Sequence, residues 1–196
     1  MPSANKCTAL QCRLDRAIQN TARTTLTDVG LVDLLSVTTS WPDEICWLKP
    51  LKSDCQRLAA VFQNKSPILS LGCGTGFYEH MTSVFSGNSV KFIGLENQGS
   101  LSQKGDPHIE RCFTGTLAYT EAVQKSTSLL FMFGHEDSVL TQFLRDHPRI
   151  NHVVVARGLS DNATDPKLLQ NYDHWKMEDC FEGLALHLIA YKKVER

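Results

Sequence analysis

The chain has 196 residues, of which 42% are hydrophobic and 21% are charged, and its formal net charge at pH 7 is −1. This length and composition are typical of an ordinary globular domain with a hydrophobic core of its own. Because the sequence has no block of Lys and Arg that could neutralise phosphates, its balanced charge argues against a dedicated nucleic-acid surface, and no obvious nucleic-acid partner is expected. A local basic patch stays open as the alternative.

The N-terminal part of the chain has two helical patterns. Apolar residues recur at helical spacing between residues 7 and 18, and a weaker pattern between residues 24 and 35 is interrupted by Gly30. Trp41 and Pro42 then indicate a turn, because the residue before a proline avoids the helical region. These patterns predict two helices that precede the main domain.

The next segment predicts a helix followed by a buried strand. Ser53 and Gln56 have the spacing of a capping box in front of an apolar helical face that extends to Phe62. A polar run and Pro67 follow, and residues 68–71 are then an apolar run too short for a helix.

Three alternate glycines, Gly72, Gly74 and Gly76, follow this strand, and residues 77–85 have a helical pattern. Glycines let the backbone turn tightly and let a ligand approach without a Cβ in the way. The unpaired N–H groups at the start of the helix then face that ligand. A strand, a glycine turn and a helix in this order are typical of a nucleotide-type site.

A second strand is predicted at residues 89–95, and Glu96 stands at its carboxyl end, twenty residues after Gly76. This is where a βαβ unit places an acid that accepts the two hydroxyl groups of a ribose. Residues 97–107 have the composition of a loop. A short strand at 109–113 and a helix at 117–124 are predicted to follow.

The second half of the chain predicts four more strands. Residues 129–133 and 152–156 are buried strands, and between them Asp137 precedes a helix that ends before Pro148. Two closing strands, 175–181 and 184–191, are joined directly and must be antiparallel neighbours. Strands that alternate with helices imply an α/β fold with a mostly parallel sheet, helices on both faces and an antiparallel C-terminal β-hairpin.

The seven cysteines are an odd number, and none of them forms a C-x-x-C pair. No metal site is therefore expected, and most cysteines are interpreted as small buried residues in a reduced compartment. No apolar run approaches the roughly 20 residues of a membrane span, and the N-terminus lacks the apolar stretch of a signal peptide. We therefore expect a cytoplasmic protein without membrane contact.

The segment from Ile68 to Gly76 resembles the first motif of class I S-adenosylmethionine-dependent methyltransferases, with Glu96 in the place of their ribose-binding acid. The resemblance extends from about Pro67 to the C-terminus. It implies a Rossmann-like fold, methyl transfer as the activity and S-adenosyl-L-methionine as the cofactor. The family usually has an acidic residue two positions before the first glycine, where this chain has Ser70.

In open α/β sheets ligands lie over the carboxyl ends of the strands. This rule and the resemblance together give the candidate cofactor-binding residues Gly72, Cys73, Gly74, Gly76, Glu96, Thr114, Thr116, Phe133 and Gly134. For Thr114 and Thr116 two interpretations are open, a contact with the adenine edge and a plain polar turn.

His135 and Glu136 follow the fourth strand, where the resemblance places the catalytic loop, and they are the candidate catalytic residues. Methyl transfer depends mainly on in-line positioning, and a base is needed only if the acceptor must first lose a proton. A loop histidine without a role is the alternative for His135, and helix capping is the alternative for Glu136. The loop lacks the Asn/Asp-Pro-Pro-Tyr/Phe motif of enzymes that methylate exocyclic amines of nucleic acids.

The favoured interpretation is a methyltransferase acting on a small-molecule acceptor, by O- or N-methylation. Residues 1–52 would form a helical lid over the substrate, and residues 53–196 would form the cofactor-binding domain. The alternatives are a methyltransferase for a macromolecule and a protein that binds the cofactor without methylating, such as a partner subunit. A nicotinamide oxidoreductase is disfavoured by the closing hairpin. The sequence leaves the oligomeric state open.

Overall fold

The computed structural model describes residues 48–65, 67–97, 109–132, 137–159, 169, 172 and 174–194. The two helices predicted at the N-terminus, and with them the lid, fall outside these ranges and stay predictions. The same holds for the segment after the fourth strand, residues 133–136.

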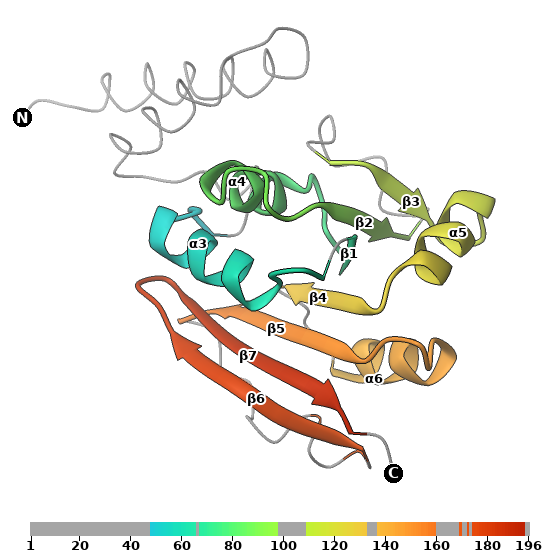
Figure 1. The fold of residues 1–196 in the computed structure, drawn as a ribbon. Coiled ribbons are helices and arrows are strands. Elements are labelled where there is room, and N and C mark those ends of the chain that lie inside the picture. Colours follow the sequence, from blue (N-terminus) through green and yellow to red (C-terminus); the bar gives the residue numbers. More distant parts are fainter. Residues whose placement is uncertain are drawn as a thin grey trace, which may run out of the picture.

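Seven strands form one sheet in the order β3-β2-β1-β4-β5-β7-β6 (Figure 1). Their bounds are β1 Ile68–Leu71, β2 Phe92–Glu96, β3 Arg111–Phe113, β4 Ser128–Met132, β5 His152–Gly158, β6 Trp175–Glu182 and β7 Leu186–Lys193. The first five strands pair in parallel, and β7 pairs antiparallel with both β5 and β6. The predicted mostly parallel sheet with a closing antiparallel hairpin is confirmed.

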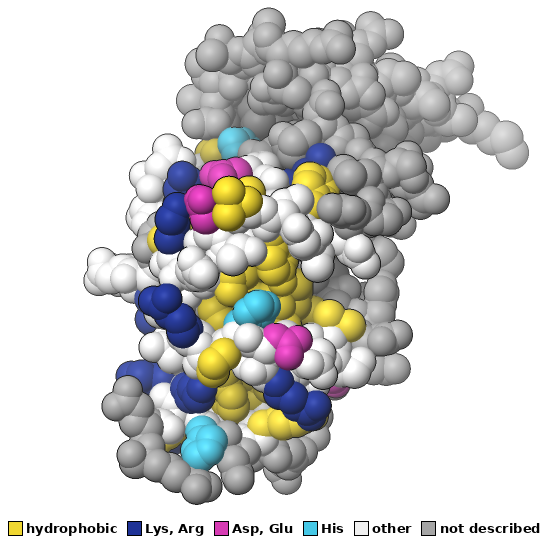
Figure 2. Space-filling model, turned by 90° about the vertical axis from the view of Figure 1, so that its right-hand side faces the viewer, with side chains coloured by type: hydrophobic (Ala, Val, Ile, Leu, Met, Phe, Trp, Pro, Cys, Tyr) yellow, Lys and Arg dark blue, Asp and Glu magenta, His cyan; other side chains and the backbone are white. Residues whose placement is uncertain are grey.

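Helices cover both faces of the sheet, as the alternating pattern predicts (Figure 1). Their bounds are α3 Lys52–Val61, α4 Phe77–Phe85, α5 Leu117–Lys125 and α6 Asp137–Asp146. The helices α3 and α4 share one buried cluster with the sheet, and α5 and α6 share the other. Figure 2 looks at the side where α5 and α6 lie and shows hydrophobic side chains at the centre of that face. None of the helices within the described ranges is long and apolar enough to cross a membrane.

The capping box predicted at Ser53 is wrong. The helix α3 starts two residues earlier than a cap at Ser53 would allow, and its N-cap residue, Leu51, makes no side-chain capping hydrogen bond. The buried carboxylate of Asp54 instead accepts hydrogen bonds from the backbone N–H groups of Leu184 (3.2 Å) and Ala185 (3.0 Å) in the β6–β7 turn. A long-range partner has replaced the local cap, and it fastens the closing hairpin to α3.

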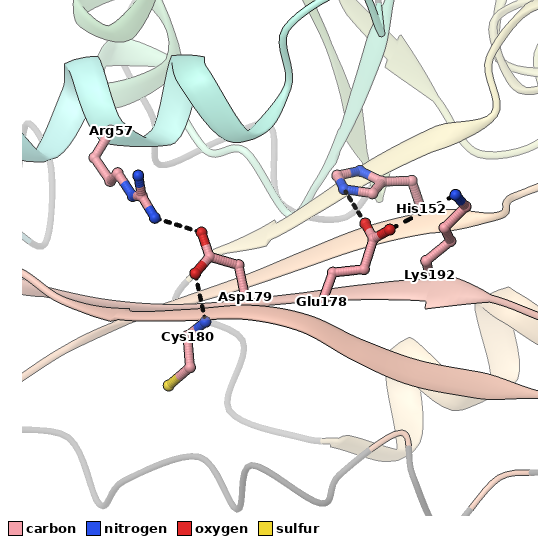
Figure 3. Close-up of polar contacts among 6 residues, drawn as sticks. All are labelled: Arg57, His152, Glu178, Asp179, Cys180 and Lys192. Carbon is pink, nitrogen blue, oxygen red and sulfur yellow. Dashed lines mark hydrogen bonds and ion pairs between the residues drawn. The ribbon is translucent and has the colours of Figure 1, made fainter.

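A β-bulge at Glu178 turns the rest of β6 toward α3. Before the bulge Met177 packs on the α5 and α6 side of the sheet, and after it Phe181 packs on the α3 side. Arg57 of α3 donates to Asp179 at 2.5 Å (Figure 3). Its guanidinium also lies over the Phe181 ring, 5.2 Å from the centroid. Burial alternates along the whole of β6, but the bulge puts its partly buried residues on opposite faces of the sheet before and after it.

The sheet has two edges that matter for function. At the carboxyl edge the parallel strands end, and the turns that lead into α4 and α5 lie there. At the amino edge the same strands begin. The topology therefore brings the glycine turn after β1 and Glu96 at the end of β2 to the carboxyl edge, because β1 and β2 are parallel neighbours.

Candidate cofactor site

The turn between β1 and α4 has the backbone that its glycines predict. Gly72, Gly74 and Gly76 have φ values of +73°, +61° and +71°, a region that residues with a Cβ rarely adopt. The N–H of Gly72 donates to the Leu95 carbonyl (2.9 Å), and Gly76 is the N-cap residue of α4. The glycines are therefore required by the conformation of the turn itself.

The space around these glycines differs from one to the next. A Cβ added at Gly72 would meet no atom of the described residues within 4 Å. A Cβ at Gly76 would lie 2.3 Å from Cγ1 of Ile109. The turn is thus open above Gly72 and closed by packing at Gly76, so Gly72 is where a ligand could approach the backbone.

Glu96 is tied directly to the glycine turn. Its carboxylate is largely buried, with 7% of the residue exposed, and Oε1 accepts a hydrogen bond of 2.6 Å from the N–H of Gly74. A carboxylate has about four acceptor positions, so this bond is compatible with further donors such as ribose hydroxyls. The structure brings together the two elements that the sequence pattern linked.

Thr114 and Thr116 lie beside Glu96 in the β3–α5 turn. The N–H and hydroxyl of Thr114 both donate to the Glu96 carbonyl, at 3.0 and 3.2 Å. The Thr116 hydroxyl donates to Phe113 O (2.7 Å) and accepts from Tyr119 N (3.2 Å), so it caps α5. These bonds account for both threonines as turn residues, and a contact with an adenine ring stays a prediction.

The sequence analysis missed Gly94 and Arg111. A Cβ at Gly94 would lie 2.2 Å from the Cys73 sulfur, so the thiol of Cys73 packs against β2. The Arg111 guanidinium donates to the Gly74 carbonyl at 3.2 Å. A glycine inside an apolar strand is a known sign of close approach and could have revealed Gly94. Nothing in the sequence around Arg111 signals its position.

The sequence analysis also missed Glu79, which brings a buried carboxyl group to the floor of the turn. Glu79 lies in the first turn of α4, is 2% exposed, and accepts a hydrogen bond of 2.5 Å from the hydroxyl of Ser70. Burial raises the pKa of Glu79 to about 7; the Ser70 hydrogen bond opposes this shift and the charge of Glu96 adds to it. The acid that the family pattern leads one to expect at residue 70 is absent from β1, but α4 supplies one to Ser70.

The candidate catalytic residues His135 and Glu136 lie outside the described residues, as do Phe133 and Gly134. The structure describes what flanks them. The strand β4 ends at Met132, and α6 begins at Asp137, whose carboxylate accepts a hydrogen bond from Arg157 at the end of β5. Among the described residues, no group of three or more His, Cys, Asp or Glu side chains could hold a metal ion.

No family model matches the chain, and no curated protein matches it in sequence. Solved structures match it at low identity. A Streptococcus pneumoniae protein assigned as a tRNA (m1A22) methyltransferase aligns with a TM-score of 0.50 at 10% identity, over 74% of this chain and 72% of that one. Its complex with S-adenosyl-L-methionine gives a TM-score of 0.49 at 12% identity, covering 74% and 73%. The 16S rRNA methylase ArmA gives 0.49 at 14% identity, covering 92% of this chain and 98% of its own.

One prediction is wrong in the light of these matches. The sequence predicts a small-molecule substrate and no nucleic-acid partner. The matched structure with a TM-score of 0.50 is that of a protein assigned as a tRNA methyltransferase. The argument from net charge fails because a sum over 196 residues hides how the charges are arranged. The predicted Rossmann-like architecture, in contrast, is confirmed by the strand order and by these matches. The chain has the fold of the class I methyltransferases.

Proposed function

We propose that this protein is an S-adenosylmethionine-dependent methyltransferase whose acceptor is RNA. The proposal that the protein binds this cofactor is supported mainly by the glycine turn, which is open above Gly72 and hydrogen-bonded through Gly74 to Glu96. A nucleoside cofactor needs these two features together: an approach to bare backbone and a carboxylate for its ribose.

The described residues fit such a cofactor. Gly72 leaves room at the backbone, the first turn of α4 offers N–H groups, and Glu96 can accept the ribose hydroxyls. When bound, S-adenosylmethionine supplies a methyl group activated by its sulfonium centre. The chain's own part is to position that group in line with the acceptor and to exclude water.

Glu79 bears on the alternative that the protein binds the cofactor without methylating. The main ground for that alternative is Ser70, which stands where the family usually has an acid. Because Glu79 contacts Ser70 at 2.5 Å, a carboxyl group is present beneath the turn after all. This contact favours a functional site over one that has lost a required group.

The acceptor class rests on the matched tRNA methyltransferase and on what the chain lacks. The residues after β4, Phe133 to Glu136, do not have the motif of enzymes that methylate exocyclic amines. A ring nitrogen or a ribose hydroxyl is therefore the proposed acceptor, with His135 as the base where a proton must leave. The test is to incubate the protein with labelled S-adenosylmethionine and total tRNA and rRNA, and to measure the label transferred to RNA. The labelled product should be degraded by RNase and not by protease.

S-Adenosylhomocysteine should raise the melting temperature of the protein, and NAD should not. A ligand at about 100 times its dissociation constant adds roughly 2.7 kcal/mol to the free energy of unfolding. Thermal shift with each ligand at millimolar concentration is the measurement. No shift with S-adenosylhomocysteine would refute cofactor binding, and a shift with NAD alone would favour an oxidoreductase.

Replacing Glu96 with Ala should weaken binding of S-adenosylhomocysteine about ten- to a hundredfold, because a charged hydrogen-bond acceptor contributes roughly 1.5–3 kcal/mol. Titration calorimetry measures the affinity. The matched control is Glu110→Ala, which removes an exposed carboxylate just before β3. Equal affinities for the two folded variants would mean that the ribose is bound elsewhere.

A further inference from the structure

Basic side chains are concentrated at the amino edge of the sheet. The amino edge consists of the first two residues of each parallel strand and of β6, together with the three residues before them. For β7, which runs in the opposite direction, it consists of the last two residues of the strand. Every strand has a Lys or Arg there, and the one at β3, Arg111, is left out of the set below because its guanidinium donates to the Gly74 carbonyl. We call this set the basic edge: Lys65, Lys91, Lys125, Arg149, Lys176, Lys192 and Lys193.

The acidic residues do not follow the same arrangement. At the start of β3, Glu110 is exposed and the guanidinium of Arg111 is directed to the Gly74 carbonyl. At the carboxyl edge the described strand ends carry Glu96, Glu182 and Arg157, and Arg157 is paired with Asp137. Two members of the basic edge have a carboxylate partner, since Glu121 lies 3.3 Å from Lys125 and Glu178 lies 3.7 Å from Lys192. Basic residues nevertheless outnumber acidic ones among the described residues of this edge, although the chain as a whole has a net charge of −1.

The pKa values of two ionisable groups at this edge, His152 and Lys65, are affected by the neighbouring charges. His152 is buried at the start of β5; burial, and then the charges of Lys65 and Lys192, lower its pKa to about 4. Burial lowers the pKa of Lys65; Glu178 opposes this shift, and Lys192 adds to it to a smaller extent. Glu178 lies 3.8 Å from His152 Nε2 and 3.7 Å from Lys192 Nζ (Figure 3). The lysines act on His152 in spite of this carboxylate.

Much of the basic edge is exposed and available. Lys91, Arg149 and Lys176 are exposed, and no carboxylate of the described residues pairs with them. From β2 to β6 the row crosses five interstrand steps, or about 24 Å. Figure 2 shows Lys and Arg side chains at several heights along the left-hand edge of its view. A long row of separated charges suits a polyanion better than a single phosphate group.

We propose that the basic edge binds the phosphate backbone of RNA, at a surface separate from the carboxyl edge where the cofactor is bound. The choice of RNA rests on the proposed function. Phosphate contacts position a nucleic acid without reading its bases, so this surface would anchor the substrate. A strand of five to seven residues spans about 17–23 Å, a distance that a folded RNA can bridge.

An anionic membrane is the other polyanionic surface that such a row could meet. A helix or edge that binds membranes combines basic residues with apolar side chains that enter the lipid. Of the exposed large hydrophobic residues in the described ranges, only Tyr172 and Val194 lie at or next to the basic edge. RNA is therefore the better fit, and vesicles belong in the test.

The experiment measures binding of a fluorescein-labelled RNA hairpin to the full-length protein by fluorescence polarisation, as a function of salt. The variant is the triple substitution Lys91→Gln, Arg149→Gln and Lys176→Gln, which breaks no ion pair of the described residues. We expect roughly a hundredfold weaker binding at 0.1 M salt, and a slope of log affinity against log salt smaller by about 2–3. The control is Lys49→Gln, Lys52→Gln and Arg145→Gln, which makes the same change in net charge elsewhere.

The outcomes separate this proposal from the proposed function. A loss confined to the basic-edge variant, with the thermal shift by S-adenosylhomocysteine unchanged, supports the proposal. Equal losses in both variants, unchanged RNA binding, or binding only to vesicles containing phosphatidylserine overturns it and leaves cofactor binding intact. If S-adenosylhomocysteine gives no thermal shift while RNA binding still depends on the basic edge, the proposal of cofactor binding is refuted and the proposal of an RNA-binding surface is supported.

Discussion

Replacing Gly76 with Ala is expected to lower the free energy of unfolding by about 2–5 kcal/mol, of which about 1–2 is backbone strain and about 1–3 is overpacking. The strain arises because φ at Gly76 is +71°. The overpacking arises because the new Cβ would lie 2.3 Å from Cγ1 and 2.9 Å from Cδ1 of Ile109, which packs against the core. Urea denaturation followed by circular dichroism measures the change.

Gly72→Ala is the matched variant, since φ there is +73° but the described residues leave its Cβ unobstructed. It should cost only about 1–2 kcal/mol of stability. Its effect should appear in binding instead, because the Cβ would occupy the space where the cofactor approaches. We expect roughly five- to a hundredfold weaker binding of S-adenosylhomocysteine. Unchanged affinity in the folded Gly72→Ala variant would show that the ligand does not use this space.

The fold could be predicted from sequence because its signals are local. The run from Ile68 to Leu71 and the three glycines define strand, turn and helix within about twenty residues. The direct connection between β6 and β7 requires antiparallel pairing, whatever the rest of the chain does. Each of these inferences needs only neighbours in sequence, and the strand order confirms them.

The site was less predictable because its hydrogen bonds join residues far apart. Ser70 and Glu79 meet only because α4 turns back over β1, and Arg111 reaches Gly74 from a strand 37 residues later. Ser53 and Gln56 have the local pattern of a capping box, but the residue between them that is bound is Asp54, by two N–H groups of the β6–β7 turn. Local propensity was outweighed by tertiary partners in each case, and no period in the sequence encodes those partners.

The net charge gave a wrong prediction about nucleic-acid binding because it, too, contains no information on which residues lie together in the fold. The sum of −1 is consistent both with evenly mixed charges and with a basic edge opposite a more acidic one. Only the sheet topology shows that Lys91, Arg149 and Lys176, from three distant parts of the sequence, share one edge. Charge arguments about nucleic-acid binding therefore need the strand order as well as the composition.

Replacing Glu79 with Gln should change how stability depends on pH. The ordinary pKa of this carboxyl group, about 4.5, applies to the unfolded chain, and burial raises it to about 7 in the folded protein. A raised pKa means that the folded protein holds a proton that the unfolded chain has lost. The stabilisation is complete below about pH 4.5 and is lost as pH rises through about 7, an effect of roughly 3 kcal/mol.

Gln cannot ionise, and its amide oxygen can still accept the hydrogen bond from Ser70. We therefore expect the wild type and Glu79→Gln to have nearly equal free energies of unfolding at pH 5, and the variant to be more stable at pH 8. Urea denaturation at the two pH values measures this, with the exposed Glu121→Gln as control. His152, whose lowered pKa acts in the opposite direction, is present in all three proteins and cancels from the difference. The same stability difference at both pH values would mean that Glu79 is ionised throughout, which would contradict a neutral carboxyl group beneath the glycine turn.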